Sequence, residues 1–449
     1  MADQTPLLPP SQMSVALDGA AIGEGSLTPD GSRVVRTPVS SKYIWLLILA
    51  SLGTFVAYVA PIGISLSLRV QELAPQNVEV LGYIVGAGAV VATVAGPLTG
   101  MWSDRTRTRI GRRRPFAIGG ALLGLLALAC LAWAPTIPLL AIGWMIAQLG
   151  WSSALNSLLL SQADRLPEEQ RGKVAGLSGF VQMIGSVLGV GIASAFIGNN
   201  YLVFLVPGIF GVVLMALWVI VIKEPSSRDM ELADKLTLTK VLGNMVFNPA
   251  NHPFFAWNWL GRLFFMFGVT FATTFTTLFF ASRLSAGGRV ADIGGLIVIL
   301  SLAGVVATAG GALLGGFLSD KLKRRRIFVL LAGLGFTAGA TIMAFGGSNA
   351  SLLITGSVVT SIGLGVFSAV DQAITLDVLP ERDTEAGRYI GINAYSTSLA
   401  QAIAPIVAAP LLLIGASGAD KNYGLLFIVA AACTLIGGTI VMVFVRSAK

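Results

Sequence analysis

The chain has 449 residues, of which 55% are hydrophobic and only 12% charged, and its mean hydropathy is +0.80. Soluble domains carry about 25% charged residues, so this composition excludes an ordinary soluble domain and indicates a protein embedded in a lipid bilayer. The formal net charge of +8 invites a nucleic-acid interpretation, which the positions of the charges argue against.

The first 41 residues are polar and rich in Pro, Ser and Gly, which predicts a disordered tail over 1–41. Apolar runs of about 20 residues, each long enough to cross a bilayer as a helix, follow. They lie near 44–66, 80–101, 116–134, 138–160, 176–198, 201–222, 254–281, 293–317, 327–346, 351–374, 390–415 and 423–445. A polar linker at 223–253 divides them into two groups of six, 42–222 and 254–446, and 447–449 forms a short tail.

The most charged stretch, GMWSDRTRTRIGRRRPF at 100–116, joins the second and third apolar runs. So short a basic segment must lie in water at the membrane surface, and loops rich in Arg and Lys are typical of the cytoplasmic side. With 1–41 on that side, nearly every Lys and Arg falls there; the exceptions are Arg69, Arg262, Arg283, Arg289 and Lys421. This asymmetry accounts for the net charge without a nucleic-acid partner. It predicts a multi-pass protein of the cytoplasmic membrane with both termini in the cytoplasm.

The two groups of apolar runs repeat one another. A weaker form of the basic turn, GGFLSDKLKRRR, occupies 315–326. Matching residues recur at offsets between 213 and 216, and these pairs are Gly53 and Gly268, Gly100 and Gly316, Asp104 and Asp320, and Asp164 and Asp377. A near-constant offset indicates duplication. The predicted fold is therefore an all-α membrane protein with 12 transmembrane helices in two pseudo-symmetric six-helix bundles.

Twelve spans, two parallel halves and the Gly-x-x-x-Asp-Arg…Gly-Arg-Arg turn together resemble the major facilitator superfamily. The longer form SDRTRTRIGRRRPF is similar to the glycoside–pentoside–hexuronide symporters and the sucrose-transporter-like proteins. The resemblance implies alternating access, with this turn joining the cytoplasmic ends of the bundles in the outward-open state. It assigns gating to Gly100, Asp104, Arg105, Arg112 and Asp320. At Gln148 and Leu159 the chain departs from plant sucrose transporters, which carry an acidic and a basic residue there.

Arg262 and Asp371 are charged residues within the seventh and tenth apolar runs. A charge at mid-membrane costs about 2.5–3.5 kcal/mol on insertion scales, so it normally faces a cavity or a partner. We expect the two to form an ion pair, with Asp371 as a candidate proton site. The alternative is that Arg262 extends to the cytoplasmic headgroups and Asp371 caps a helix end.

Neutral polar residues recur at helical spacing in the fourth, fifth and eleventh runs. Amides and hydroxyls on inward faces suit an uncharged, sugar-like small molecule. The candidate substrate-binding residues are Tyr58, Gln148, Asn156, Gln182, Gln372 and Asn393. The alternative is that these residues hold membrane helices together.

No cofactor is expected, because one histidine and two cysteines leave no credible transition-metal site and no Walker A sequence is present. The expected function is secondary active transport, not catalysis, by a monomer in the lipid bilayer that moves a sugar or glycoside by symport with protons. Two alternatives remain open: proton-coupled efflux of drugs or metabolites on the same fold, and a non-transporting receptor or sensor.

Overall fold

The computed structural model describes residues 38–228, 246–381, 385–416 and 421–445, and within these ranges every regular element is a helix. Most of the predicted tail 1–41, the middle of the linker 223–253 and the end of the chain lie outside the described residues.

The first half consists of helices that match the first six apolar runs. They are α1 (Ser41–Ala60), the π-helical turn η1 (Pro61–Ser65), α2 (Leu66–Leu73), α3 (Val80–Arg105), α4 (Arg114–Trp133), α5 (Ile137–Arg165), α6 (Glu168–Ser194) and α7 (Leu202–Val221). Helix α1 begins where the Ser40 side chain accepts a hydrogen bond from the Tyr43 amide, and α4 and α5 each carry a proline in the first turn. Local capping therefore determines where these helices begin.

The second half repeats the series. Its elements are α9 (Pro253–Thr274), α10 (Thr276–Leu284), the 3-10 turn η2 (Val290–Ile293), α11 (Gly294–Leu322), α12 (Arg325–Phe345), α13 (Ala350–Asp377), α14 (Ala386–Leu411) and α15 (Tyr423–Phe444). Asn349 and Asn422 cap α13 and α15 by accepting from the Leu352 and Leu425 amides.

Ten described helical segments are long and apolar enough to cross a membrane, or eleven when α9 and α10, bent by 44°, are taken as one span. Helix α14 is not among them, although its 26 residues suffice in length. Its Asn393-Ala-Tyr-Ser-Thr-Ser stretch makes it more polar than its neighbours. The predicted total of twelve is consistent with this arrangement.

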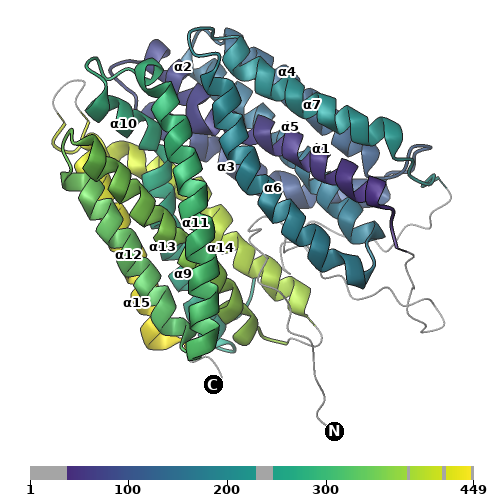
Figure 1. Cartoon of the computed structure of the whole chain (residues 1–449). Helices are drawn as coiled ribbons and strands as arrows, with labels where there is room; N and C mark the ends of the chain where they lie inside the picture. Colours follow the sequence, from purple (N-terminus) through teal and green to yellow (C-terminus); the bar gives the residue numbers. More distant parts are fainter. Residues whose placement is uncertain (1–37, 229–245, 382–384, 417–420, 446–449) are drawn as a thin grey trace.

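Figure 1 shows the purple-to-teal helices on one side of the molecule and the green-to-yellow helices on the other. Within the first half α1 packs on α5, α6 and α7, and within the second α9 packs on α14 and α15. The matched glycines explain one repeated contact. A Cβ at Gly53 would overlap Leu214 of α7, and a Cβ at Gly268 would overlap Thr434 of α15. In both halves glycine lets the first helix approach the sixth closely.

The halves touch where α3 crosses α14 and where α6 crosses α11. Gly82 and Gly86, near the start of α3, face Pro405 and Ile406 near the end of α14. Gly294, at the start of α11, faces Ile197 just beyond α6. All of these approaches lie at the end of the molecule away from the arginine turn 106–113, and the halves diverge from there (Figure 1).

The first membrane-spanning helix of each half is interrupted at an equivalent position. In the first half α1 passes into the π-helical turn at Pro61, and in the second the chain bends between Thr274 and Thr276. The breaks meet across the halves, since the Thr277 hydroxyl donates to the carbonyl oxygen of Gly63 at 2.7 Å. A π-helical turn offers carbonyls for such contacts.

Candidate functional site

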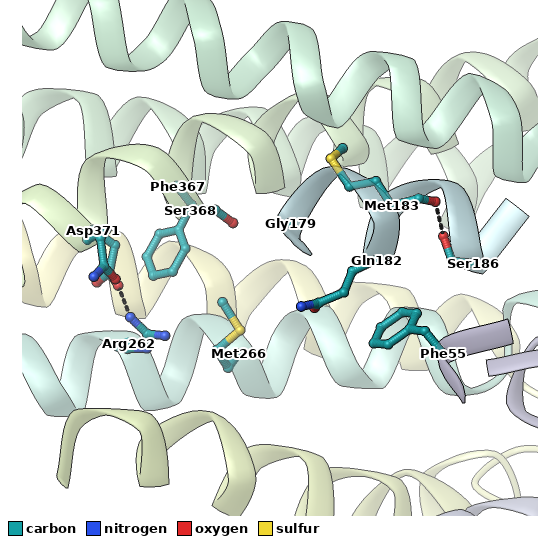
Figure 2. Close-up of a pocket in the computed structure, with 11 residues that line it drawn as sticks. Phe55, Gly179, Gln182, Met183, Ser186, Arg262, Met266, Phe367, Ser368 and Asp371 are labelled. Carbon is teal, nitrogen blue, oxygen red and sulfur yellow. Dashed lines mark hydrogen bonds and ion pairs between the residues drawn. The ribbon is translucent and has the colours of Figure 1, made fainter. Parts of the chain in front are cut away.

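A cavity of about 240 Å³ lies between the two halves. Helices α1 and α6 supply one wall, and α9 and α13 supply the other. Its lining residues are Phe55, Gly179, Gln182, Met183, Ser186, Arg262, Met266, Phe367, Ser368, Asp371 and Gln372. Figure 2 shows the charged residues on one side of the cavity and Gln182, Ser186 and Phe55 on the other. Any solute held there touches both halves.

Arg262 and Asp371 form the predicted ion pair. Arg262 Nη1 donates to Asp371 Oδ2, and Arg262 Nε donates to Thr397 Oγ1 at 3.3 Å. Both side chains are buried, with 5% and 1% of their residues' surface exposed. Because so little of either residue is exposed, each charge depends largely on the other for its stabilisation. The second carboxylate oxygen, Oδ1, has no hydrogen-bond partner among the described residues.

A layer of neutral polar residues lies behind this pair within the second half. The Asn258 and Asn393 side-chain amides each donate to Thr375 Oγ1 at 3.1 Å. All three residues are buried, and none is among the residues that line the cavity. The structure thus places the predicted substrate ligand Asn393 in a network that supports α13, one turn beyond Asp371.

The remaining substrate candidates separate into two groups. Gln182 and Gln372 line the cavity. Tyr58 instead lies within hydrogen-bonding reach of Gln148, which is buried. Asn156 donates to the Gly96 carbonyl at 2.9 Å and so joins α5 to α3. The cavity therefore brings together two of the six candidates, along with both members of the ion pair.

Ser186 belongs to the neutral polar face predicted for the fifth apolar run, and sequence reasoning missed the other five side chains of the lining: Phe55, Met183, Met266, Phe367 and Ser368. Ser368 had a recognisable signal, because it lies three and four positions before Asp371 and Gln372 and so shares their helical face. The Phe and Met residues had none, since apolar side chains in a membrane helix face lipid, core or cavity alike.

A second polar site lies at the arginine turn. Arg113 is buried, and its Nη2 lies 2.7 Å from Asp104 Oδ1 while its Nε lies 2.8 Å from Asp164 Oδ2. Arg113 Nη1 also donates to Ser103 Oγ at 2.7 Å. The predicted gating residue Arg112 lies 3.6 Å from Asp104 and 2.7 Å from Asp164. One buried arginine therefore joins the ends of α3 and α5.

The second half repeats this arrangement. Arg325 lies 2.8 Å from Asp320 and 2.8 Å from Asp377, which belong to the last turns of α11 and α13. The predicted gating residues Asp104 and Asp320 therefore occupy equivalent clamps, and these ion pairs each stay within one half. Of the other two predicted gating residues, Arg105 is exposed, and a Cβ at Gly100 would make only ordinary contacts, with its nearest neighbours at 3.8 and 3.9 Å.

The chain after α7 docks on the arginine turn. Ser227 Oγ donates to the Thr106 carbonyl, and the Thr108 amide donates to Ser227 Oγ, both at 3.0 Å. Glu224 accepts from Ser161 Oγ at 3.3 Å. Burial raises the pKa of the Glu224 carboxyl, and the charges of Arg165 and Arg114 oppose that rise only in part. Gly111 has φ +90°, and a Cβ there would overlap the Glu224 side chain.

Residues 43–313 and 294–449 match the family model described as the Major Facilitator Superfamily, and the two matches together cover most of the chain. The chain belongs to the major facilitator superfamily. The predicted family is thereby confirmed, as is the all-helical membrane fold that it implies. The Major Facilitator Superfamily is a family of transporters.

Among curated proteins, the transporter is 35% identical over 104 residues to the general alpha-glucoside permease of Schizosaccharomyces pombe. That match covers 22% of this chain and 17% of the permease, so the chain aligns with well under two thirds of that relative.

Solved structures resemble the whole transporter. The nucleoside transporter NupG has a TM-score of 0.71 at 12% identity, covering 90% of this chain and 100% of that one. A bacterial homologue of the human lysosomal transporter Spinster, in an inward-facing conformation, has a TM-score of 0.68 at 16% identity, covering 90% of this chain and 97% of that one. The D-xylose–proton symporter has a TM-score of 0.67 at 16% identity, covering 91% and 99%. At these identities the similarity establishes the fold alone.

Proposed function

We propose that this protein imports an uncharged, polyhydroxylated solute such as a sugar or glycoside, together with protons. The observation that carries the proposal is the polar lining of the cavity. Besides one ion pair, all of its polar side chains are neutral amides or hydroxyls, and both halves contribute them: Gln182, Ser186, Ser368 and Gln372. Such groups both donate and accept, as sugar hydroxyls do.

Alternating access follows from where the halves touch. Their contacts gather at the end away from the arginine turn, so the cavity between them faces the end where they diverge. A rocking motion about the cavity would close that end and open the other. Under the proposed orientation, with both termini cytoplasmic, the described conformation is inward-facing.

Proton coupling is assigned to Asp371. While Arg262 holds the carboxylate, its charge is compensated. When substrate or the rocking motion draws Arg262 away, an ionised carboxyl at this buried position is disfavoured and takes up a proton. Re-forming the ion pair then releases that proton. Making and breaking one buried pair thus links proton transfer to the conformational cycle.

One relative supports a sugar as the substrate class, because the 104 residues that match by sequence belong to a protein named an alpha-glucoside permease. The domain boundaries that we propose are 42–222 and 254–446 for the two bundles, with the linker 223–253 between them.

Efflux of a more apolar solute is the second candidate function. Its support is the apolar portion of the cavity lining, formed by Phe55, Met183, Met266 and Phe367. Methionine side chains adapt to varied apolar ligands. An exporter would use the same Asp371–Arg262 pair with the opposite direction of solute flow.

Uptake into proteoliposomes tests these proposals. Purified protein is reconstituted, and labelled monosaccharides, disaccharides and aryl glycosides are offered with and without an inward proton gradient. The proposal expects accumulation of at least one sugar above its external concentration only with the gradient. Accumulation without any gradient dependence would contradict proton coupling, and gradient-driven movement of apolar dyes alone would favour efflux.

A further inference from the structure

The two halves are joined by a buried ion pair at the end of the molecule away from the arginine turn. Lys421 Nζ, just before α15, lies 3.0 Å from Glu79 Oε2, just before α3. Both residues are buried, with 5% and 7% of their surfaces exposed. The ion pairs described above at the arginine end stay within a half, whereas this one crosses between halves.

Further polar contacts surround this crossing. Gln71 uses both ends of its side-chain amide across the halves: Nε2 donates to the Gly288 carbonyl at 2.7 Å, and Oε1 accepts from the Val290 amide at 2.9 Å. Thr277 donates to Gly63 close by. These groups belong to loops and helix ends that separate when this end of the transporter opens.

We infer that Glu79 and Lys421 form the gate that keeps this end closed, each neutralising a charge that the other half buries. When the halves separate at this end, both charges enter water and neither needs a partner. In the closed state, removal of one partner leaves the other charge buried and uncompensated, which is strongly unfavourable. The pair therefore controls the equilibrium between the two facing states.

The chemistry also explains why an ion pair suits a gate that must reopen. Mutual attraction of a buried pair is largely offset by the loss of hydration of both ions. The ion pair therefore forms only when the two halves meet in the correct position, but it adds little net stability to the closed state. A neutral, apolar pair of similar size would close at least as well.

The inference rests on alternating access but not on the identity of the solute or ion, so it is tested without substrate. In a background with Cys130→Ser and Cys433→Ala, spin labels are placed at Gln76 and Ala286, exposed on opposite halves beside the gate. A second pair, at Arg109 and Lys321, reports the arginine end. Double electron–electron resonance measures both distances for the full chain in nanodiscs.

Glu79→Gln and Lys421→Met should each increase the population with a long Gln76–Ala286 distance about tenfold or more, and shorten the Arg109–Lys321 distance. The charge exchange Glu79→Lys with Lys421→Glu, and the neutral double variant Glu79→Gln with Lys421→Met, should both restore the wild-type distributions. The matched control is Glu72→Gln, whose exposed pair with Arg69 lies within one half at the same end. It should change neither distance.

Unchanged distances in both single variants would overturn the inference, as would failure of both double variants to restore them or an equal effect of Glu72→Gln. Distances that shift as expected, together with no detectable sugar uptake, would support the gate and contradict the proposed substrate. Sugar uptake together with unshifted distances would support the proposed substrate and contradict the gate.

Discussion

Arg113 and Arg325 hold equivalent positions in the two halves, and each lies between two aspartates near the ends of the second and fourth spans of its half. Arg113 is the more buried, and it adds a hydrogen bond to Ser103. The matching Ser319 hydroxyl instead donates to the Gly316 carbonyl. The duplicated clamp joins the helix ends within each half.

Removing the buried arginine tests this rigidity. Arg113→Ala should lower the free energy of unfolding by about 1–3 kcal/mol, because Asp164 loses a close charge-assisted donor in a partly buried site. Thermal unfolding in detergent and initial uptake rates measure the effect. Arg109→Ala, an exposed position in the same turn, is the control and should unfold as the wild type does. Equal stability of both variants would argue against the clamp.

Neutralising the proposed proton site should separate coupling from binding. Asp371→Asn is expected to abolish gradient-driven accumulation while retaining exchange of labelled for unlabelled sugar, since the amide keeps the side-chain shape but has no titratable carboxyl. Counterflow and gradient-driven uptake are compared on the same vesicles. Retention of full uphill uptake would remove Asp371 from the coupling mechanism.

The cavity lining distinguishes two predicted substrate ligands. Gln182→Ala should raise the KM for sugar about 2- to 10-fold, because one hydrogen bond is worth about 0.5–1.5 kcal/mol. Asn156→Ala should leave KM within about twofold and lower the thermal stability instead, since its amide bonds to the Gly96 backbone. A large KM effect for Asn156→Ala alone would relocate the site toward α3 and α5.

Glu224 predicts a pH-dependent stability. Its raised pKa means that the folded state binds this proton more tightly than the unfolded state does, so its contribution to stability is present at low pH and is lost as pH rises through the folded pKa. Glu224→Gln imitates the protonated form. Its melting temperature should therefore exceed that of the wild type near neutral pH, and the difference should shrink as the medium is acidified. Differential scanning fluorimetry across this range measures the gap; a gap that widens on acidification would contradict the assignment.

Much of the site was predictable because membrane burial makes charge conspicuous. Arg262 and Asp371 stood out as charges in apolar helices, and the structure pairs them. The repeat spacing pointed to Asp164 and Asp377, yet their role as clamp partners was not predicted, since a matching offset shows equivalence without showing contact.

Pattern alone could not distinguish between polar residues that face the cavity and those that join helices. Gln182 and Asn156 have the same chemistry and both lie on polar helical faces, but only Gln182 lines the cavity. The rotation of each helix about its axis decides this, and packing against neighbouring helices sets that rotation.

The sequence by itself determined the helices and their duplication, because hydrophobicity, spacing and local capping act over short distances. Only the tertiary structure decided which residues meet across the two halves. Glu79 and Lys421 are far apart in the chain and lie in loops without a distinctive motif, and their pairing arises solely from how one half rests on the other.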